Sequence, residues 1–403
     1  MEYDDPPEGQ AVAERAREFV DTEVIPVEHE YLGDGPVPET VISDLQERAR
    51  EYEVYAPQIP EEYGGLGLDL QAALPVFEQA GRSLLGARAL RVDAPDEGNM
   101  HTLELVGTDA QKDRWLDPLA AGEIRSAFAM TEPMDGGGSD PKMLRTTARR
   151  EDGEWVLDGH KWWTTNGSVA EVFLVLARTD PDAHPYQGTS IILVPADADG
   201  VEVVRDVPHL GGEFLGESHA EVRFEDVRVP ESNLLGTENA GFAIAQQRLG
   251  PARLTHCMRF CGLADRALDI AKAYASERSA FGEPLAEKQS ARFAIARRET
   301  DLHAARTMVR HAARALDSGD ARTEVAACKY FTANAVGEAV DTAVQLCGGA
   351  GISKDLPLAD FYEAVRAFRI YDGPDEVHLR TLARDAFEDV PAGELDGLPR
   401  YGE

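Results

Sequence analysis

Residues 369–378, RIYDGPDEVH, place a tyrosine, several acidic side chains, a Gly-Pro pair and a histidine within ten positions. Asp372 comes directly before Gly373 and Pro374, a combination that interrupts a helix or strand in any protein. A carboxylate in such a turn can also remove a proton from a bound substrate. On this stretch alone the turn interpretation is favoured, and the rest of the chain reverses that preference.

Two further segments combine residue types suited to binding a flat cofactor. Residues 127–140, AFAMTEPMDGGGSD, run into three glycines, and residues 159–168, GHKWWTTNGS, pair adjacent tryptophans with adjacent threonines. Glycine lets a backbone approach a ligand closely, and hydroxyl and N–H groups can bind polar ring edges or phosphate. The alternatives are a surface loop between domains and tryptophans that only fill a core. Together, the two segments indicate an aromatic wall and hydroxyl donors around a flat cofactor.

A metal site is not expected. His256, Cys257 and Cys261 are candidate ligands by type, but the two cysteines lie four positions apart on a predicted helix, where buried packing is more common. The four cysteines of the chain show no disulfide spacing, which favours a reducing cytoplasm.

Three zones of hydrophobic periodicity must position these segments. Residues 1–125 are predicted to be helical; one helix begins near Pro38 and places Val41, Leu45, Ala49 and Tyr52 on one face. Residues 126–240 change to a period of two and predict a β domain, a sandwich or a barrel. Its apolar runs are EVFLVLAR and TSIILVPA, and an alternating strand places Ala220, Val222, Phe224, Val227 and Val229 on one face. Residues 241–403 return to long, alanine-rich amphipathic patterns that predict a helical bundle.

Composition excludes several classes of function. The chain of 403 residues has a formal net charge of −33, which repels nucleic acid and anionic membranes. No apolar run approaches the ~18–20 residues of a membrane helix, and the N-terminus lacks a signal-peptide pattern. The acidic excess is spread along the chain, as is typical of proteins that work in concentrated salt, so a halophile's cytoplasmic protein is expected.

At this point the chain closely resembles the acyl-CoA dehydrogenase family of flavoenzymes over nearly its whole length. The resemblance lies in IPEEYGGLGL, GTDAQKDRWLDPLAAGE, FAMTEP followed by GSD, VRVPESNLLG, ERSAFGEPL and VQLCGGAGI, in the order of the family. It implies an α+β fold with an N-terminal helical domain, a middle β domain and a C-terminal four-helix bundle. It also implies FAD as cofactor, an acyl-CoA substrate, electron-transfer flavoprotein as partner and a homo-oligomer, a dimer or a tetramer.

The resemblance assigns roles to individual positions. Asp372 occupies the place of the base that removes the α-proton, where most members have glutamate; the family's second base position is Ala252, which cannot accept a proton. Aspartate is one methylene shorter, about 1.5 Å of reach, so the backbone must bring Asp372 closer. The implied substrate contacts are Ser139, Arg253 and Gly373. The implied cofactor contacts are Phe128, Met130, Thr131, Trp163, Thr165, Arg278, Phe281, Gln289, Gln345, Gly349 and Glu376, of which Arg278, Phe281, Gln289, Gln345 and Gly349 are expected to reach the FAD of a neighbouring subunit.

The expected reaction is α,β-dehydrogenation of an acyl-CoA thioester to the trans-2-enoyl-CoA, with an apolar pocket raising the pKa of Asp372 in the complex. The motifs APDEGNM, HKWW, LTHCMR and DGPDEVH resemble the branch of family members ten and eleven, which is associated with longer, branched or 4-hydroxylated acyl chains. Two alternatives remain at this stage. One is an enzyme similar to nitroalkane oxidase, which has this fold and an aspartate base; the other is a non-catalytic, DNA-associated flavoprotein, against which the net charge argues.

Overall fold

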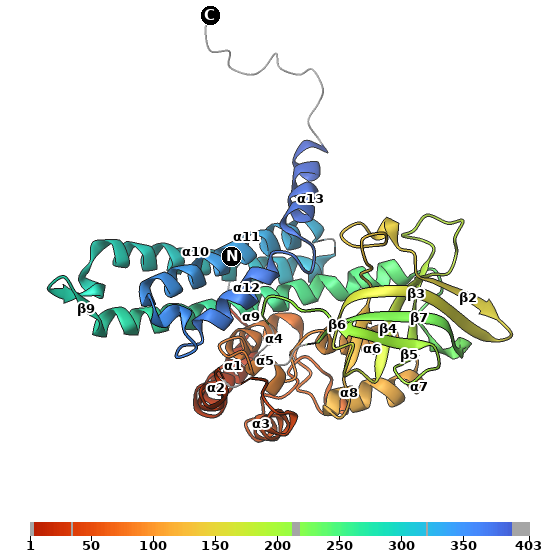
Figure 1. The fold of residues 1–403 in the computed structure, drawn as a ribbon, viewed down its shortest axis with the longest axis horizontal. Helices are drawn as coiled ribbons and strands as arrows, with labels where there is room; N and C mark the ends of the chain where they lie inside the picture. Colours follow the sequence, from red (N-terminus) through yellow and green to blue (C-terminus); the bar gives the residue numbers. More distant parts are fainter. Residues whose placement is uncertain (1–3, 34, 212–217, 320, 389–403) are drawn as a thin grey trace, which may run out of the picture.

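The computed structural model describes residues 4–33, 35–211, 218–319 and 321–388. Helices come first along the chain, a β-sheet follows, and long helices complete the molecule (Figure 1). The predicted fold class is therefore confirmed. Among the described residues, no helix combines the length and apolar character needed to cross a membrane.

The N-terminal region is built from short helices that pack into a hydrophobic core shared with the C-terminal helices. The face predicted for the third helix is largely correct, because Leu45 and Ala49 are buried while Val41 and Tyr52 are partly buried. The helices are α1 (Pro7–Phe19), α2 (Ile25–Tyr31), α3 (Glu39–Glu51), α4 (Leu70–Ala80), α5 (Gly86–Ala89), α6 (Asp96–Val106), α7 (Asp109–Gln111) and α8 (Asp117–Ala121), with π-helical turns at Val20–Val24 and Lys112–Leu116 and a 3-10 turn at Glu61–Tyr63.

The middle region forms one mixed sheet of eight strands. Its order is β6-β7-β3-β2-β4-β5-β8, and β1 pairs in parallel with β4. The strands are β1 (Ser126–Ala129), β2 (Thr147–Glu151), β3 (Glu154–Thr165), β4 (Val172–Arg178), β5 (Thr189–Pro195), β6 (Val201–Asp206), β7 (His219–Pro230) and β8 (Leu234–Leu235), with 3-10 turns at Pro141–Met143 and Glu231–Asn233.

The apolar patterns of these strands follow from what covers each face. In β4, Leu174 and Leu176 join the core shared with the helices, whereas Phe173 and Val175 join the separate core of the sheet. A strand buried on both faces reads as a continuous apolar run, as observed in the sequence. The five predicted inward residues of β7 are all buried, and the break in their alternation coincides with a bulge at Asp226, whose φ is 48°.

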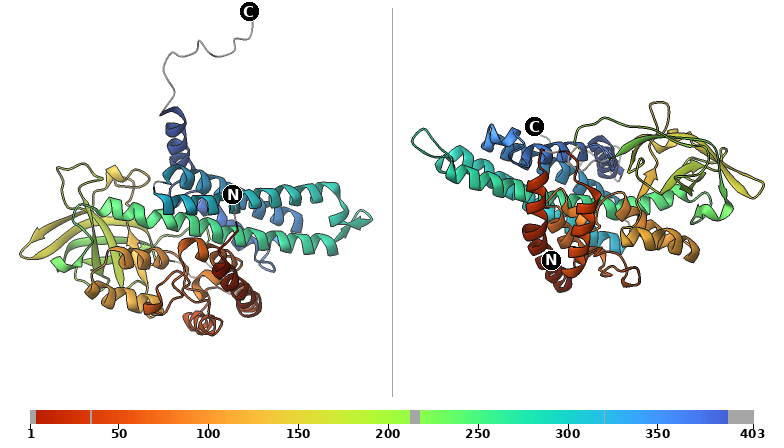
Figure 2. Two further views of the ribbon diagram at one scale, coloured as in Figure 1. Left: turned by 180° about the vertical axis from the view of Figure 1, so that it is seen from behind. Right: turned by 60° about the horizontal axis from the view of Figure 1, so that its bottom comes forward.

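The C-terminal region is dominated by three long helices that lie side by side (Figures 1 and 2). The first of them, α9, is 37 residues long, about 55 Å at the usual helical rise, and runs from the sheet to the small hairpin at the opposite end of the molecule. The elements are α9 (Gly241–Glu277), β9 (Ser279–Ala280), β10 (Glu283–Pro284), α10 (Gln289–Ser318), α11 (Arg322–Cys347), α12 (Leu358–Phe368) and α13 (Asp375–Glu388), with 3-10 turns at Leu285–Glu287 and Ala350–Ile352.

Candidate active site

Asp372 lies in the short loop between α12 and α13 and contacts the first half of α9 through Arg253 and His256. Its φ is 56°, a left-handed conformation that residues other than glycine rarely adopt, and the φ of Gly373 is 96°. A Cβ at Gly373 would lie 2.8 Å from the His378 ring, so only glycine fits there. Such strain persists only where the surroundings enforce it.

Side chains from three helices hold the carbonyl groups of this loop. Arg253 of α9 donates from Nε to the Asp372 carbonyl at 2.8 Å, and His378 of α13 donates from Nε2 to the same oxygen at 3.2 Å. Lys329 of α11 donates from Nζ to the carbonyls of Phe368 at 2.5 Å and Gly373 at 3.0 Å. The loop is therefore attached on both sides of Asp372.

The carboxylate of Asp372 is mostly buried, with 15% of its side chain exposed, and lies beside His256. The Nδ1 atom of His256 is 3.1 Å from Asp372 Oδ2 but 2.7 Å from the Ala252 carbonyl. Since a carbonyl only accepts, Nδ1 carries the hydrogen and donates it to Ala252. Asp372 Oδ2 is consequently buried without a hydrogen bond from the described part of the chain, and it is available to a ligand.

The electrostatic surroundings of Asp372 favour its ionised form in the protein without substrate. Burial raises the pKa of Asp372, but His256, Arg253, Arg248 and Lys329 together lower it below its ordinary value. Burial itself lowers the pKa of His256 to about 4, so at neutral pH the permanent positive charges are the two arginines and the lysine. The rise in the pKa of Asp372 that is expected in the substrate complex stays a prediction. In the free protein this pKa is lowered.

A second buried carboxyl group, Glu97 of α6, lies near Asp372. Glu97 is 4% exposed, and its Oε2 has no hydrogen-bond partner among the described residues. Burial raises the pKa of Glu97 to about 7, although Arg259 and Arg248 oppose the rise, and the charge of Asp372 adds to it. The segment APDEGNM contains this residue, but nothing in the sequence distinguishes it from an exposed helical glutamate.

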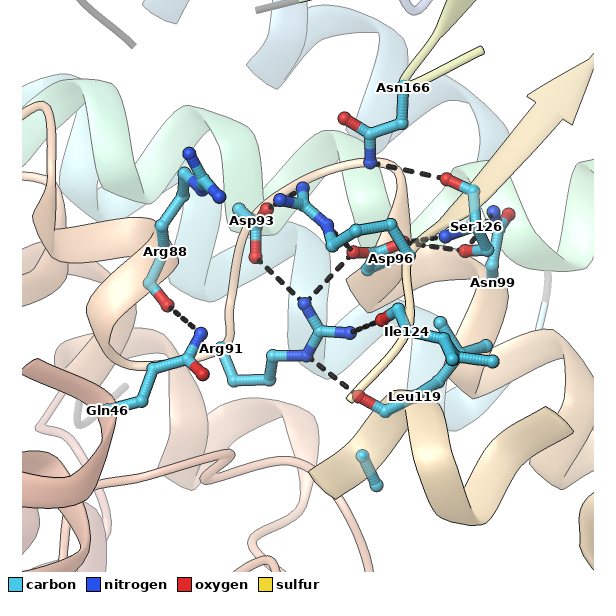
Figure 3. A network of polar contacts seen from close by, with 12 residues as sticks. Gln46, Arg88, Arg91, Asp93, Asp96, Asn99, Leu119, Ile124, Ser126 and Asn166 are labelled. Atoms are coloured by element: carbon cyan, nitrogen blue, oxygen red, sulfur yellow. Dashed lines mark hydrogen bonds and ion pairs between the residues drawn. The ribbon is translucent and has the colours of Figure 1, made fainter. Parts of the chain in front are cut away.

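The neighbouring Asp96 anchors the start of β1 (Figure 3). It is fully buried and accepts hydrogen bonds from the backbone N–H and hydroxyl of Ser126 at 2.8 and 2.6 Å. Arg91 and Arg125 pair with its other oxygen at 3.0 and 2.5 Å. Asn166 donates to the Ser126 carbonyl at 3.2 Å, so the network connects β1 to the end of β3.

The predicted cofactor residues of the sheet gather on β1 and β3. The Arg248 guanidinium lies 4.3 Å from the centre of the Phe128 ring, and the backbone N–H of Trp162 donates to the Thr131 carbonyl at 2.9 Å. Lys161 is fully buried and donates to the Met130 carbonyl at 3.0 Å, which attaches the segment after β1 to β3.

Trp163 and Thr165 present their side chains near a pair of histidines. Trp163 has a φ of 57° and is 40% exposed, an unusual exposure for an indole, and its ring contacts His209 and His219. The Thr165 hydroxyl lies 2.9 Å from His219 Nδ1. A half-exposed aromatic face beside hydroxyl groups fits the flat ring of a flavin.

The remaining predicted contacts are exposed and lie in several places. Ser139 lies in the glycine-rich loop, and Glu376 lies in the first turn of α13. The others lie towards the end of the bundle that is farthest from the sheet: Arg278, Phe281 and Gln289 around the hairpin, and Gln345 and Gly349 at the end of α11. Gln345 is sixteen residues beyond Lys329 on α11, about 24 Å by helical rise, so this group does not join Asp372 in one site of one subunit.

Sequence reasoning missed Lys329, Arg248 and Glu97, and considered His256 only as a metal ligand. Lys329 offers one signal, because it lies four residues from Val325 and from Ala333 on the buried stripe of α11. A lysine on an apolar stripe is unusual and suggests a buried partner. Within the described ranges, no group of His, Cys, Asp and Glu is arranged to hold a metal ion, and all four cysteines are buried and free.

Family models match the chain in three consecutive segments. They are "Acyl-CoA dehydrogenase, N-terminal domain" over residues 6–123, "Acyl-CoA dehydrogenase, middle domain" over 127–227 and "Acyl-CoA dehydrogenase, C-terminal domain" over 239–387. Among solved structures, "a putative acyl-CoA dehydrogenase from Mycobacterium abscessus" is 36% identical with a TM-score of 0.88, covering 96% of this chain and 99% of that one. Butyryl-CoA dehydrogenase from Megasphaera elsdenii is 27% identical with a TM-score of 0.84, covering 96% and 100%.

Curated relatives agree with these matches. The "Probable acyl-CoA dehydrogenase FadE2" of Mycobacterium tuberculosis is 40% identical over 383 residues, 92% of this chain and 93% of the relative. Mouse acyl-CoA dehydrogenase family members 10 and 11 are 38% and 37% identical over 98% and 94% of this chain. The chain spans only 39% and 50% of those two longer proteins. The chain therefore belongs to the acyl-CoA dehydrogenase family.

Proposed function

We propose that the protein oxidises an acyl-CoA thioester to the trans-2-enoyl-CoA with FAD as the electron acceptor and Asp372 as the base. The observation that carries this proposal is the lowered pKa of the Asp372 carboxyl group in the free protein, together with one buried oxygen that has no hydrogen bond from the described chain. The resemblance to the family assigns Asp372 to the base position. The other base position of the family is Ala252, whose methyl group cannot accept a proton.

Asp372 has two tasks in this mechanism. Its carboxylate removes the α-proton of the thioester, and its backbone N–H, which donates to no described residue, binds the thioester carbonyl. A hydrogen bond to that oxygen stabilises the negative charge that develops as the proton leaves. The bonds from Arg253 and His378 to the Asp372 carbonyl hold both groups in one orientation.

The flavin ring would be held by Phe128, Met130, Thr131, Trp163 and Thr165. Glu376, four residues after the proposed base, is a further proposed cofactor contact. FAD bound there would supply the acceptor for the hydride that leaves the β-carbon. A homo-oligomer is proposed because five exposed residues towards the far end of the bundle suit contacts with the FAD of a neighbouring subunit. They are Arg278, Phe281, Gln289, Gln345 and Gly349. Electron-transfer flavoprotein is the proposed electron acceptor, and Ser139, Arg253 and Gly373 are the proposed substrate contacts.

The test is anaerobic bleaching of the flavin absorbance by a panel of acyl-CoA thioesters, with nitroethane as a competing substrate class. We expect bleaching by at least one thioester and none by nitroethane. Asp372→Asn should retain the yellow holo-protein and acyl-CoA binding while losing about 10²- to 10⁴-fold in bleaching rate. Asp372→Glu should show weak activity, because the longer side chain overreaches in a loop shaped for aspartate. Normal bleaching by Asp372→Asn would mean that another group takes the proton.

A further inference from the structure

We propose that Lys329 is a positioning residue for the base: its ammonium group binds the backbone on both sides of Asp372 and keeps a positive charge beside that carboxylate. The inference rests on the proposed role of Asp372 and extends it to a residue of another helix. None of the motifs that identify the family includes Lys329, which lies 43 residues before the base.

The contacts of Lys329 are unusual for a lysine. The side chain is completely buried, yet its ammonium forms no ion pair with a carboxylate in the described ranges, and two carbonyl groups receive its hydrogen bonds. The ammonium also lies 4.6 Å from the centre of the Phe368 ring. A buried, unpaired ammonium is costly, and burial indeed lowers the pKa of Lys329. Packing alone does not require this cost, because a methionine fills a similar volume.

Lys329 differs from the other donors around the loop because it binds carbonyl groups on both sides of Asp372. Arg253 and His378 both bind one carbonyl, that of Asp372, whereas Lys329 connects the end of α12 at Phe368 to Gly373 on the other side of the base. The intervening residues must close a turn in which Asp372 is left-handed. The bridge from Lys329 therefore sets the length of that turn.

The charge of Lys329 must be judged against every group that faces Asp372. Arg248, Arg253 and His256 come from α9, His378 comes from α13, and Glu97 comes from α6. His256 and His378, with pKa values of about 4, are neutral at neutral pH. Lys329 thus supplies one of three positive charges near Asp372, and the other carboxyl groups nearby are Glu97 and, beside Lys329, Asp375 of α13.

The experiment compares Lys329→Met, which removes both the charge and the hydrogen bonds, with Lys329→Gln, which removes the charge and retains N–H donors on a side chain one bond shorter. Lys272→Met is the matched control, because it removes a lysine from the same bundle at a half-exposed position. The readout is the pH dependence of kcat for acyl-CoA between pH 5 and 9, which reports ionisation in the substrate complex, where the pKa of Asp372 is expected to rise.

We expect the acidic limb of the kcat profile to move to higher pH in both Lys329 variants, because each loses a positive charge that lowers the pKa of Asp372. The rate at pH 7 should fall at least about 10-fold in Lys329→Met and less in Lys329→Gln. If ionisation of Glu97 also affects the pH profile, its contribution is common to all variants. The profile of Lys272→Met should match that of the wild type. A limb that stays in place in a folded Lys329→Gln protein would overturn the proposal.

A second measurement separates this inference from the proposed function. Unfolding free energies of Lys329→Gln, Asp372→Asn and the double variant form a cycle that needs no substrate. Coupled charges make the two effects non-additive, whereas independent residues give additive effects. Additivity would refute the role of Lys329 even if acyl-CoA bleaches the flavin. Clear coupling without any bleaching would refute the proposed function and leave the link between Lys329 and Asp372 intact.

Discussion

At the residue scale, the unusual group near the proposed base, Asp372, is Glu97. Because burial raises the pKa of Glu97 from its ordinary 4.5 to about 7, the folded protein holds a proton that the unfolded chain releases. Its contribution to stability is complete below pH 4.5 and is lost as the pH rises through 7. At pH 8 the buried, ionised carboxylate costs about 3 kcal/mol, from about 1.4 kcal/mol per pKa unit.

Glu97→Gln should therefore raise the melting temperature at pH 8 and change it little at pH 5. Glu104→Gln, a partly exposed glutamate on the same helix, is the control. Differential scanning calorimetry at the two pH values measures the effect. Equal shifts at both values would show that glutamine acts through packing rather than through the removal of a titrating group.

At the scale of elements, the network around Asp96 determines how α6 meets the first strand of the sheet. Burial raises the pKa of Asp96, but Arg91, Arg125 and the bonds from Ser126 lower it overall. This carboxylate stabilises the fold above its ordinary pKa of 3.8, and the stabilisation is lost as the pH falls through the lowered value.

Asp96→Asn removes a buried carboxylate that pairs with Arg91 and Arg125 and leaves Asp93 as their remaining charge partner. Loss of one partner of a buried ion pair typically costs up to about 3–5 kcal/mol. We expect a large fall in melting temperature at pH 7 and weaker FAD retention, because Phe128 follows Ser126 on the same strand. Asp113→Asn, on the exposed surface nearby, should change neither quantity. A variant as stable as the wild type would show that the arginines find other partners.

At the scale of the whole molecule, the net charge of −33 over 403 residues means about one excess negative charge per twelve residues. Repulsion among exposed charges weakens when salt shortens its range to ~3 Å at molar concentration. The melting temperature should therefore rise between low and molar KCl. A control in sucrose at equal osmolality separates charge screening from solvent exclusion. An equal rise in melting temperature in sucrose and in KCl would contradict the halophile interpretation.

The exposed end of the bundle leads to a prediction about assembly. Phe281 is 99% exposed with a φ of 55°, a poor state for a phenylalanine in contact with water. Light scattering should show that the holo-protein is larger than one chain of 43.9 kDa. Phe281→Ala should release FAD more readily, whereas Leu105→Ala, which also removes an exposed apolar side chain, should not. A monomer that retains FAD tightly would disprove the proposed sharing.

The sequence by itself determined the order of the regions and the family. Periodicity separated helices from strands because each face of an element is either buried or solvated, as the five inward residues of β7 show. Asp372 is proposed as the base from the family resemblance and not from its own segment, because that segment by itself favours a turn.

The tertiary structure alone decided what surrounds that base. Lys329, Arg248 and Glu97 come from three helices that are distant in sequence, and each resembles an ordinary helical residue in its own segment. Their effect on Asp372 depends on distance and burial, since charges interact strongly only when they are close and away from water. Periodicity carries no such information, because it records which face of a helix is buried and not which groups meet there.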